Sequence, residues 1–317
     1  MSLATRVLLA LEWLTIGAGV VAMVAVLVAR WPRSSADDGE LHATSACDGG
    51  KGPRAAYRAW LDGAELPGDP TAPEPALDDS LRARGGQLFA TYCASCHGAR
   101  GDGKGETATV LETRPADLTT GVYALRTTEH EALPTDTDLF RTITRGIHGT
   151  AMPPWLALPE RDRWALVAYI KTLSKAFAED EAPAPVDATP PAETPARIEH
   201  GRQLFASGGC ASCHGAEGRG DGAAAAALPI KPRNFTAGRF HRGSRTADIY
   251  MTLATGLDGT PMGSFANVLG SDDLWDVAMF VHTLAPSVVE QRGLRCRAAS
   301  TPSADEVVGI RTLLQKL

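Results

Sequence analysis

The sequence predicts an all-α protein in which an N-terminal transmembrane helix precedes two tandem copies of one helical domain. Three observations support this prediction. The stretch Cys-Ala-Ser-Cys-His occurs twice, at residues 93–97 and 210–214, inside a longer repeated frame. A proline-rich segment separates the two copies, and each copy closes with apolar residues at helical spacing. The expected boundaries are 1–33 for the anchor, 34–79 for a Pro-rich tether, 80–178 for domain 1, 179–196 for a Pro-rich linker, 197–286 for domain 2 and 287–317 for a C-terminal tail.

The anchor is predicted from an apolar segment near the N-terminus. Glu12 is the only charged residue between Val7 and Ala29. About 23 helical residues at about 1.5 Å each span about 35 Å, which is enough to cross a bilayer core. A cleaved signal peptide is the competing interpretation, but no convincing Ala-x-Ala site precedes the polar stretch that starts at Arg30. An uncleaved single helix over residues 7–29 is therefore expected.

Composition excludes one class of partner, and the linkers define the layout. The chain has 317 residues and a formal net charge of -6, whereas nucleic-acid binding needs a concentrated basic surface. We therefore expect no nucleic-acid partner. Residues 66–75 and 182–195 are rich in proline, and such chain tends to be extended and semi-rigid.

The two Cys-Ala-Ser-Cys-His stretches predict two covalently attached haem c groups. With this spacing the two cysteine sulfurs form thioethers with the porphyrin, and the adjoining histidine lies beneath the iron as its proximal ligand. A disulfide or half of a zinc site is the alternative, but it must explain the histidine that follows the second cysteine in both copies. The predicted haem-attaching cysteines are Cys93, Cys96, Cys210 and Cys213, and the predicted proximal ligands are His97 and His214.

The agreement between the copies extends well beyond these stretches. Gln-Leu-Phe-Ala precedes the cysteines in both, at residues 87–90 and 203–206. Pro115 lies 18 positions after His97 (115 − 97), and Pro232 lies 18 positions after His214 (232 − 214). The chain thus contains an internal repeat of a whole domain rather than of a short motif.

These motifs resemble class I cytochromes c, and the resemblance covers both units, about 190 of the 317 residues. It implies that both domains have the class I cytochrome c fold. In that family a proline carbonyl accepts a hydrogen bond from the second nitrogen of the proximal histidine and so fixes the tautomer of the ring. Pro115 and Pro232 match that position, with simple loop punctuation as the alternative.

The resemblance also implies a methionine as the sixth iron ligand in each domain. Residues 146–153 align with residues 256–263, and the methionine lies six positions after the glycine in both (152 − 146; 262 − 256). Met152 and Met262 are the matched candidates. Methionine is ordinarily core filler, which is the expected role of Met251. His148 is the rival ligand in the first loop, but its counterpart is Asp258, so the repeat does not require it as a ligand.

Family resemblance further implies that the last helix of each domain crosses the first. Gly85 and Gly201 would let the backbones approach, and the aromatic pairs expected at these crossings are Phe89 with Tyr169 and Phe205 with Phe280. Ser271 is a plausible N-cap of the last helix. In the tail, a capping-box pattern at residues 303–306 predicts a short amphipathic helix, and a Cys47–Cys296 disulfide is possible in an oxidising compartment.

Ligation by histidine and methionine leaves no open position for substrate at either iron, which predicts outer-sphere transfer of single electrons. Cytochromes c are assembled on the outer face of the inner membrane, so the haem domains are expected in the periplasm. The expected partners are a membrane redox complex, either quinol-oxidising or a terminal oxidase, and a soluble periplasmic carrier. The alternative is a haem enzyme, a peroxidase or small-molecule dehydrogenase, in which one haem has lost its methionine.

Overall fold

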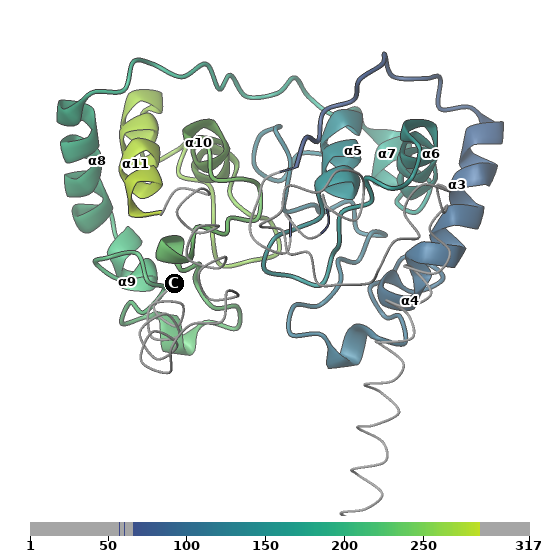
Figure 1. Ribbon diagram of the computed structural model, residues 1–317, viewed down its shortest axis with the longest axis horizontal. Helices are drawn as coiled ribbons and strands as arrows, with labels where there is room; N and C mark the ends of the chain where they lie inside the picture. Colours follow the sequence, from purple (N-terminus) through teal and green to yellow (C-terminus); the bar gives the residue numbers. More distant parts are fainter. Residues whose placement is uncertain (1–56, 58–59, 61–65, 286–317) are drawn as a thin grey trace, which may run out of the picture. The chain divides into compact units, whose positions relative to one another are not determined.

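The computed structural model describes residues 57, 60 and 66–285, which form helices and loops without a β-strand (Figure 1). The first repeat contains α3 (Asp79–Tyr92), α4 (Ala94–His97), η2 (Ala108–Val110), α5 (Asp136–Arg145), α6 (Glu160–Lys171) and α7 (Ala176–Glu179). The second contains α8 (Pro195–Ser207), α9 (Cys210–His214), η3 (Ala225–Ala227), η4 (Phe235–Ala237), α10 (Thr246–Thr255) and α11 (Ser271–Leu284). The prediction of an all-α fold is confirmed for these residues.

Three predictions concern parts of the chain outside the described residues: the anchor over residues 7–29, the tail helix over 303–317 and the Cys47–Cys296 pair. Among the helices of the described ranges, none is long and apolar enough to cross a membrane.

Local sequence accounts for where the main helices begin. The Asp78 carboxylate accepts a hydrogen bond from the backbone N–H of Leu81 at the start of α3, at 2.8 Å. The Thr194 side chain caps α8 in the same way, and Pro195 occupies the first turn, where its missing N–H has no cost. At α11 the predicted cap is wrong by one residue. Gly270 precedes the helix without a side-chain cap, and the Ser271 hydroxyl instead lies 3.1 Å from the hydroxyl of Tyr250.

The first and last helices of each repeat cross at a glycine, as predicted. A Cβ added at Gly85 would lie 1.9 Å from the backbone carbonyl oxygen of Ala165, and one added at Gly201 would lie 1.9 Å from that of Asp276. Only glycine permits such an approach of two backbones. The predicted aromatic pairs flank the crossings, with ring centroids 5.2 Å apart for Phe89–Tyr169 and 5.4 Å apart for Phe205–Phe280.

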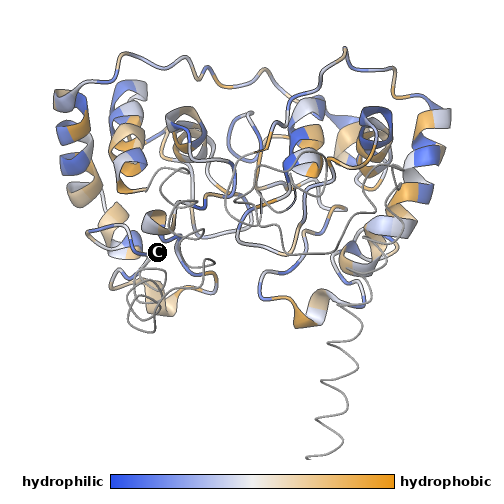
Figure 2. Ribbon diagram, in the orientation of Figure 1, coloured by the Kyte–Doolittle hydropathy of each residue, from blue (hydrophilic) through white to orange (hydrophobic). Residues whose placement is uncertain are grey.

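Each repeat has its own hydrophobic core between these crossing helices and a third helix, α5 or α10. Figure 2 shows that the helices carry both hydrophobic and hydrophilic residues, as expected for amphipathic helices around a core. The second core contains the fully buried Ala278 and the nearly buried Phe205 and Trp275. Both repeats belong to one compact unit. This arrangement positions two copies of the predicted site in a single folded body.

Candidate functional site

The predicted haem-attaching cysteines lie on or beside a short helix in each repeat, α4 and α9. All four cysteines of the described residues are free thiols. Burial, and to a lesser degree the neighbouring Cys96, raises the pKa of Cys93 to about 12, and burial raises the pKa of Cys210. The structure therefore presents paired, uncrosslinked thiols at the Cys-x-x-Cys spacing that thioether attachment requires.

The loop after each histidine folds back on the short helix through the same backbone hydrogen bonds. The N–H of Gly103 donates to the carbonyl of His97 at 2.8 Å, and the N–H of Gly220 donates to that of His214 at 2.7 Å. The residue after each histidine is a glycine with a left-handed backbone, Gly98 with φ 80° in the first repeat. A side chain there is strained, so the glycine is a requirement of the turn.

Each predicted proximal histidine is held by a backbone carbonyl. The Nδ1 of His97 donates to the carbonyl of Ala116 at 3.1 Å, and the Nδ1 of His214 donates to that of Arg233 at 3.1 Å. Donation from Nδ1 leaves the Nε2 lone pair for a metal. Burial lowers the pKa of both histidines, which keeps the rings in the neutral form that a metal ligand needs.

The sequence predicted that the proline carbonyl accepts the hydrogen bond from the histidine. In the structure the acceptor is the carbonyl of the next residue, Ala116 or Arg233. The carbonyls of Pro115 and Pro232 face the backbone of the returning loop: a Cβ added at Gly103 would lie 2.8 Å from the Pro115 oxygen, and one added at Gly220 would lie 2.6 Å from the Pro232 oxygen. Successive carbonyls in an extended chain point in opposite directions, so the next carbonyl is the one that meets the ring.

The predicted methionine ligands end two loops with the same internal geometry. The N–H of Ile147 donates to the carbonyl of Met152 at 3.0 Å, and the N–H of Leu257 donates to that of Met262 at 2.8 Å. The glycine that opens each loop has a left-handed backbone, with φ 66° at Gly146. Both loops thus present methionine from a closed turn at the end of α5 or α10.

One contact in these loops was not anticipated from the sequence. The hydroxyl of Thr150 accepts from the N–H of Met152 at 3.1 Å, and the hydroxyl of Thr260 accepts from the N–H of Met262 at 3.1 Å. Each hydroxyl also donates to a carbonyl at the start of its loop, at 2.8 and 2.7 Å. The threonine two residues before both methionines was the available signal for this role.

The rival candidates have other environments. Met251 is 5% exposed within α10 and contributes to packing, as expected. The ring of His148 stacks on Trp60 with centroids 4.9 Å apart, and its carbonyl accepts from Nδ1 of His241 at 2.9 Å. His148 therefore joins the first methionine loop to the second repeat.

The donor set of each repeat fits haem c. It combines two free thiols, a neutral imidazole with its Nδ1 already engaged, and a thioether presented by a closed loop. A cluster of three or more His, Cys, Asp or Glu side chains suited to a metal ion is absent from the described residues.

Comparisons with known proteins agree with this geometry. The family described as cytochrome c oxidase, cbb3-type, subunit III matches residues 80–170, and the family described as cytochrome c matches residues 198–285. The chain is 28% identical over 239 residues to the cbb3-type cytochrome c oxidase subunit FixP of Azorhizobium caulinodans, covering 73% of this chain and 68% of that protein. It is 38% identical to a chain of the reducing HAO-like protein complex of Kuenenia stuttgartiensis, with a TM-score of 0.62, covering 64% of this chain and 96% of that one.

The chain belongs to the cytochrome c family and carries two class I cytochrome c domains in tandem. Domains of this family bind haem c covalently, and the chain is a c-type cytochrome that acts in electron transfer.

Proposed function

We propose that this protein is a membrane-anchored dihaem cytochrome c that passes single electrons between a membrane redox complex and a periplasmic carrier or terminal oxidase. Each repeat holds one haem through its cysteine pair. His97 and Met152 ligate the first iron, and His214 and Met262 ligate the second. Residues 7–29 anchor the chain in the inner membrane, and the linkers 34–79 and 179–196 separate the anchor, domain 80–178 and domain 197–286.

The repeated methionine loop is the observation that carries this proposal. Both loops close with the same backbone hydrogen bond and the same threonine contact, although their sequences differ at several positions. Because the loop has the same geometry in both repeats, it supports methionine ligation at both irons. Two irons with closed coordination favour a carrier over an enzyme, and His/Met ligation gives higher potentials than two histidines.

The printed names of the relatives support a terminal oxidase as the partner. One relative is a subunit of a cbb3-type cytochrome c oxidase, and the family described as subunit III of that oxidase matches the first repeat. We propose that the chain delivers electrons within or to such an oxidase. The net charge of -6, to which haem propionates add, favours an electropositive docking partner.

Ligand replacement tests the two iron sites separately. In Met152→Ala and Met262→Ala, one haem should lose its Met-to-iron charge-transfer band and its potential should fall, because the thioether stabilises the ferrous state. A redox titration with optical spectra of the full chain measures both effects. Met251→Leu is the matched control and should change neither, since Met251 packs inside α10. An unchanged spectrum and potential in either alanine variant would refute methionine ligation at that haem.

Partner and anchor are tested on the full chain in its membrane. In mild detergent it should co-purify with a haem–copper oxidase and be re-oxidised by it, whereas deletion of residues 7–29 should release the haem domains into the soluble fraction. Co-purification with an unrelated complex, or a deletion variant that stays in the membrane, would contradict these assignments. Turnover of peroxide by a high-spin resting haem would favour the enzyme alternative.

A further inference from the structure

The carbonyl that holds the proximal histidine belongs to a different kind of residue in each repeat. His97 donates to the carbonyl of Ala116, and His214 donates to that of Arg233, both at 3.1 Å. The two acceptors are equivalent, since each lies 19 positions after its histidine (116 − 97; 233 − 214). Ala116 carries only a methyl group, whereas the guanidinium of Arg233 is a strong hydrogen-bond donor. Only the second acceptor can therefore be held in place by hydrogen bonds of its own side chain.

The Arg233 side chain contacts His241, which bridges it to the first repeat. The Nη2 of Arg233 lies 2.5 Å from Nε2 of His241 and 2.9 Å from its Nδ1. The same Nδ1 lies 2.9 Å from the carbonyl oxygen of His148. A guanidinium only donates and a carbonyl only accepts, so the assignment that satisfies both has the ring accept at Nε2 and donate from Nδ1. Both ring nitrogens of His241 are thus used in joining Arg233 to His148.

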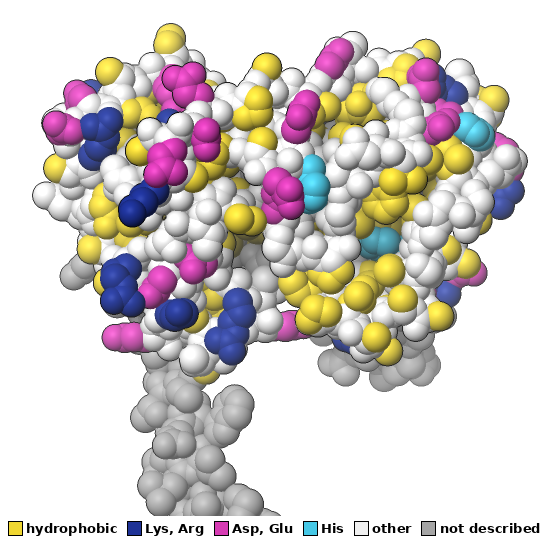
Figure 3. All heavy atoms as spheres, turned by 180° about the vertical axis from the view of Figure 1, so that it is seen from behind, with side chains coloured by type: hydrophobic (Ala, Val, Ile, Leu, Met, Phe, Trp, Pro, Cys, Tyr) yellow, Lys and Arg dark blue, Asp and Glu magenta, His cyan; other side chains and the backbone are white. Residues whose placement is uncertain are grey.

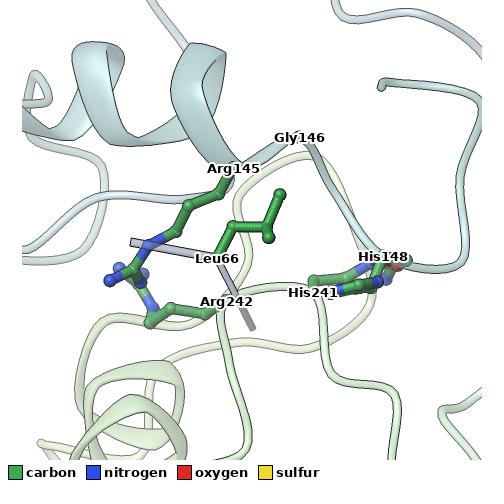
Figure 4. Close-up of a pocket in the computed structure, with 6 residues that line it drawn as sticks. All are labelled: Leu66, Arg145, Gly146, His148, His241 and Arg242. Atoms are coloured by element: carbon green, nitrogen blue, oxygen red, sulfur yellow. Dashed lines mark hydrogen bonds between the residues drawn. The ribbon is translucent and has the colours of Figure 1, made fainter. Parts of the chain in front are cut away.

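The bridge ends in the loop that presents the predicted ligand of the other iron. His148 lies in the Met152 loop, which is closed by a backbone hydrogen bond of 3.0 Å to the carbonyl of Met152. Figure 4 shows His148 and His241 on one side of a small cavity that residues of both repeats line, with Arg145 and Arg242 on the other side. The bridge therefore connects the proximal side of the second haem site with the methionine side of the first.

A second contact joins Arg233 to the same loop. A Cβ added at Gly149 would lie 2.4 Å from Nη1 of Arg233 and 3.1 Å from its Cζ, so the guanidinium lies directly against this glycine. Gly259 is the equivalent residue of the Met262 loop and has nearly the same left-handed backbone, with φ 79° against 76°. A Cβ added at Gly259 would meet nothing within 4 Å. The two glycines thus share a backbone conformation and differ in the contact with Arg233.

Aromatic contacts connect the second proximal histidine to the same place. Phe235 stacks on the His214 ring with centroids 4.5 Å apart, and Phe240 stacks on Phe235 at 5.6 Å. His241 directly follows Phe240 in the chain. The residue of the first repeat that is equivalent to Phe235 is Leu118 (235 − 117), which has no aromatic ring. The second repeat therefore links its proximal ligand to His241 both through Arg233 and through this stack.

We propose that Arg233 and His241 are positioning residues that tie the proximal ligand of the second haem to the methionine loop of the first repeat, so that the second potential depends on that loop. This inference rests on the proposed ligation of the irons by His214 and Met152. A hydrogen bond from Nδ1 to a fixed carbonyl makes the ligating imidazole more basic, which favours the ferric state. Contacts that fix the Arg233 carbonyl therefore keep the second potential low. The linkage between loop geometry and reduction acts in both directions.

The test is a spectroelectrochemical titration of the full chain with both haems attached, in which Met262→Ala identifies the second haem. His241→Phe keeps a ring at this position but removes both hydrogen bonds. The reduction equilibrium of the second haem should then shift towards the ferrous form by about twofold to tenfold, where tenfold corresponds to about 59 mV for one electron. The electron paramagnetic resonance spectrum of the ferric second haem should also change, because it depends on the orientation of the His214 ring.

A conservative variant and an exposed histidine control this measurement. His241→Gln should keep most of the wild-type potential and spectrum, because its amide can accept from Arg233 and donate to the carbonyl of His148. His282→Phe is the same substitution at an exposed position of α11 and should change neither signal.

Substitution of the glycines tests the link from the side of the methionine loops. The methyl group of Gly149→Ala must displace the Arg233 guanidinium, so the second haem should shift although the substitution lies in the loop of the first. Gly259→Ala is the matched control, because its new methyl group meets nothing, and it should leave the first haem unchanged. A Gly149→Ala variant that altered only the first haem would overturn the proposal.

Two further results separate this inference from the proposed function and from a purely structural role. If His241→Phe lowered the free energy of unfolding but left the potential and spectrum of the second haem unchanged, His241 would only stabilise the fold. That result, in a chain shown to hold two haems, would refute this inference alone. A haem count below two would instead refute the proposed function.

Discussion

The two repeats share the same backbone hydrogen bonds and glycines around the predicted haem site but have different core side chains. This comparison shows which features of the two repeats are kept and which differ. In the first repeat Phe140 stacks on Trp164 at 4.5 Å. In the second, Tyr250 stacks on Trp275 at 4.0 Å, and Phe235 stacks on the ring of His214 at 4.5 Å. The frame itself consists of backbone hydrogen bonds and glycines and is the same in both. Core side chains can therefore diverge while the ligand-bearing loops keep their geometry.

The repeats also differ in what they offer to each other and to solvent. At equivalent loop positions the second repeat presents Asp258, which forms an ion pair with Arg126, and the first presents His148, whose carbonyl accepts a hydrogen bond from the His241 ring. On the face drawn in Figure 3, Lys and Arg side chains gather mainly over the first repeat, and hydrophobic side chains gather over the second. The two repeats therefore differ in the side chains that they present on this face.

The largest effect is expected from removing the carboxylate of Asp258, which forms an ion pair with Arg126 between the two repeats. Asp258→Asn leaves Arg126 buried without its counter-charge, which should lower the free energy of unfolding by about 3–5 kcal/mol. Urea unfolding of the haem-loaded chain followed by circular dichroism measures the loss. Asp272→Asn is the control, because this carboxylate is 86% exposed and such pairs contribute at most about 1 kcal/mol. A loss below that value for Asp258→Asn would mean that the buried pair does not stabilise the interface.

Substitution at the helix crossings tests whether the two frames are equally constrained. Gly85→Val and Gly201→Val should each cost about 1–3 kcal/mol or more, because the new Cβ would overlap a backbone carbonyl. Thermal unfolding of each variant measures the effect. Gly86→Ala serves as the control in the same helix, since its Cβ would meet the flexible Tyr169 ring at 3.2 Å. Wild-type stability in either valine variant would contradict the close crossing.

Protonation of His241 should distinguish the repeats, because its counterpart is Ala124 (241 − 117), which does not titrate. Burial and the charge of Arg233 lower the pKa of His241 from 6.5 to about 4, against the hydrogen bond to the His148 carbonyl, which raises it. The unfolded chain takes up this proton at a higher pH than the folded chain. His241 therefore causes stability to fall as the pH drops from about 6.5 to about 4, by at most about 1.4 kcal/mol per pH unit.

The measurement for His241 is the free energy of unfolding at several pH values in this range. His241→Gln should reduce the slope of the free energy of unfolding against pH by up to the equivalent of one bound proton. His282→Gln, at an exposed position of α11, serves as the control. An unchanged slope in His241→Gln would show that the ring is not held neutral.

The smallest expected effect concerns the helix that precedes each methionine loop. Thr135 caps α5 in a capping box with Asp138, whereas Arg245 precedes α10 without a side-chain cap. Thr135→Ala should therefore cost about 1 kcal/mol, and Arg245→Ala should cost less, because the ion pair of Arg245 with Asp248 involves an arginine side chain that is 61% exposed. Equal losses in parallel denaturant titrations would show that the two helices do not differ in their caps.

The sequence by itself determined the features that depend on local spacing. It predicted the helical repeat, the glycine crossings with their aromatic pairs, and the packing role of Met251. These predictions were possible because helical periodicity and equal intervals are visible in the sequence alone. The cysteine, histidine and methionine assignments came from the same intervals and stay predictions.

Tertiary structure decided what depends on the direction of a group or on residues far apart in the chain. Spacing could not tell that the carbonyl of Ala116, rather than that of Pro115, accepts the hydrogen bond from His97. The interval between two residues does not show in which direction each carbonyl points. Nor could spacing pair Arg126 with Asp258 or bring Arg145 to Arg242, since these residues meet only when the two repeats pack together. Local pattern therefore defines each haem domain, and the packing of the repeats defines the charges between them.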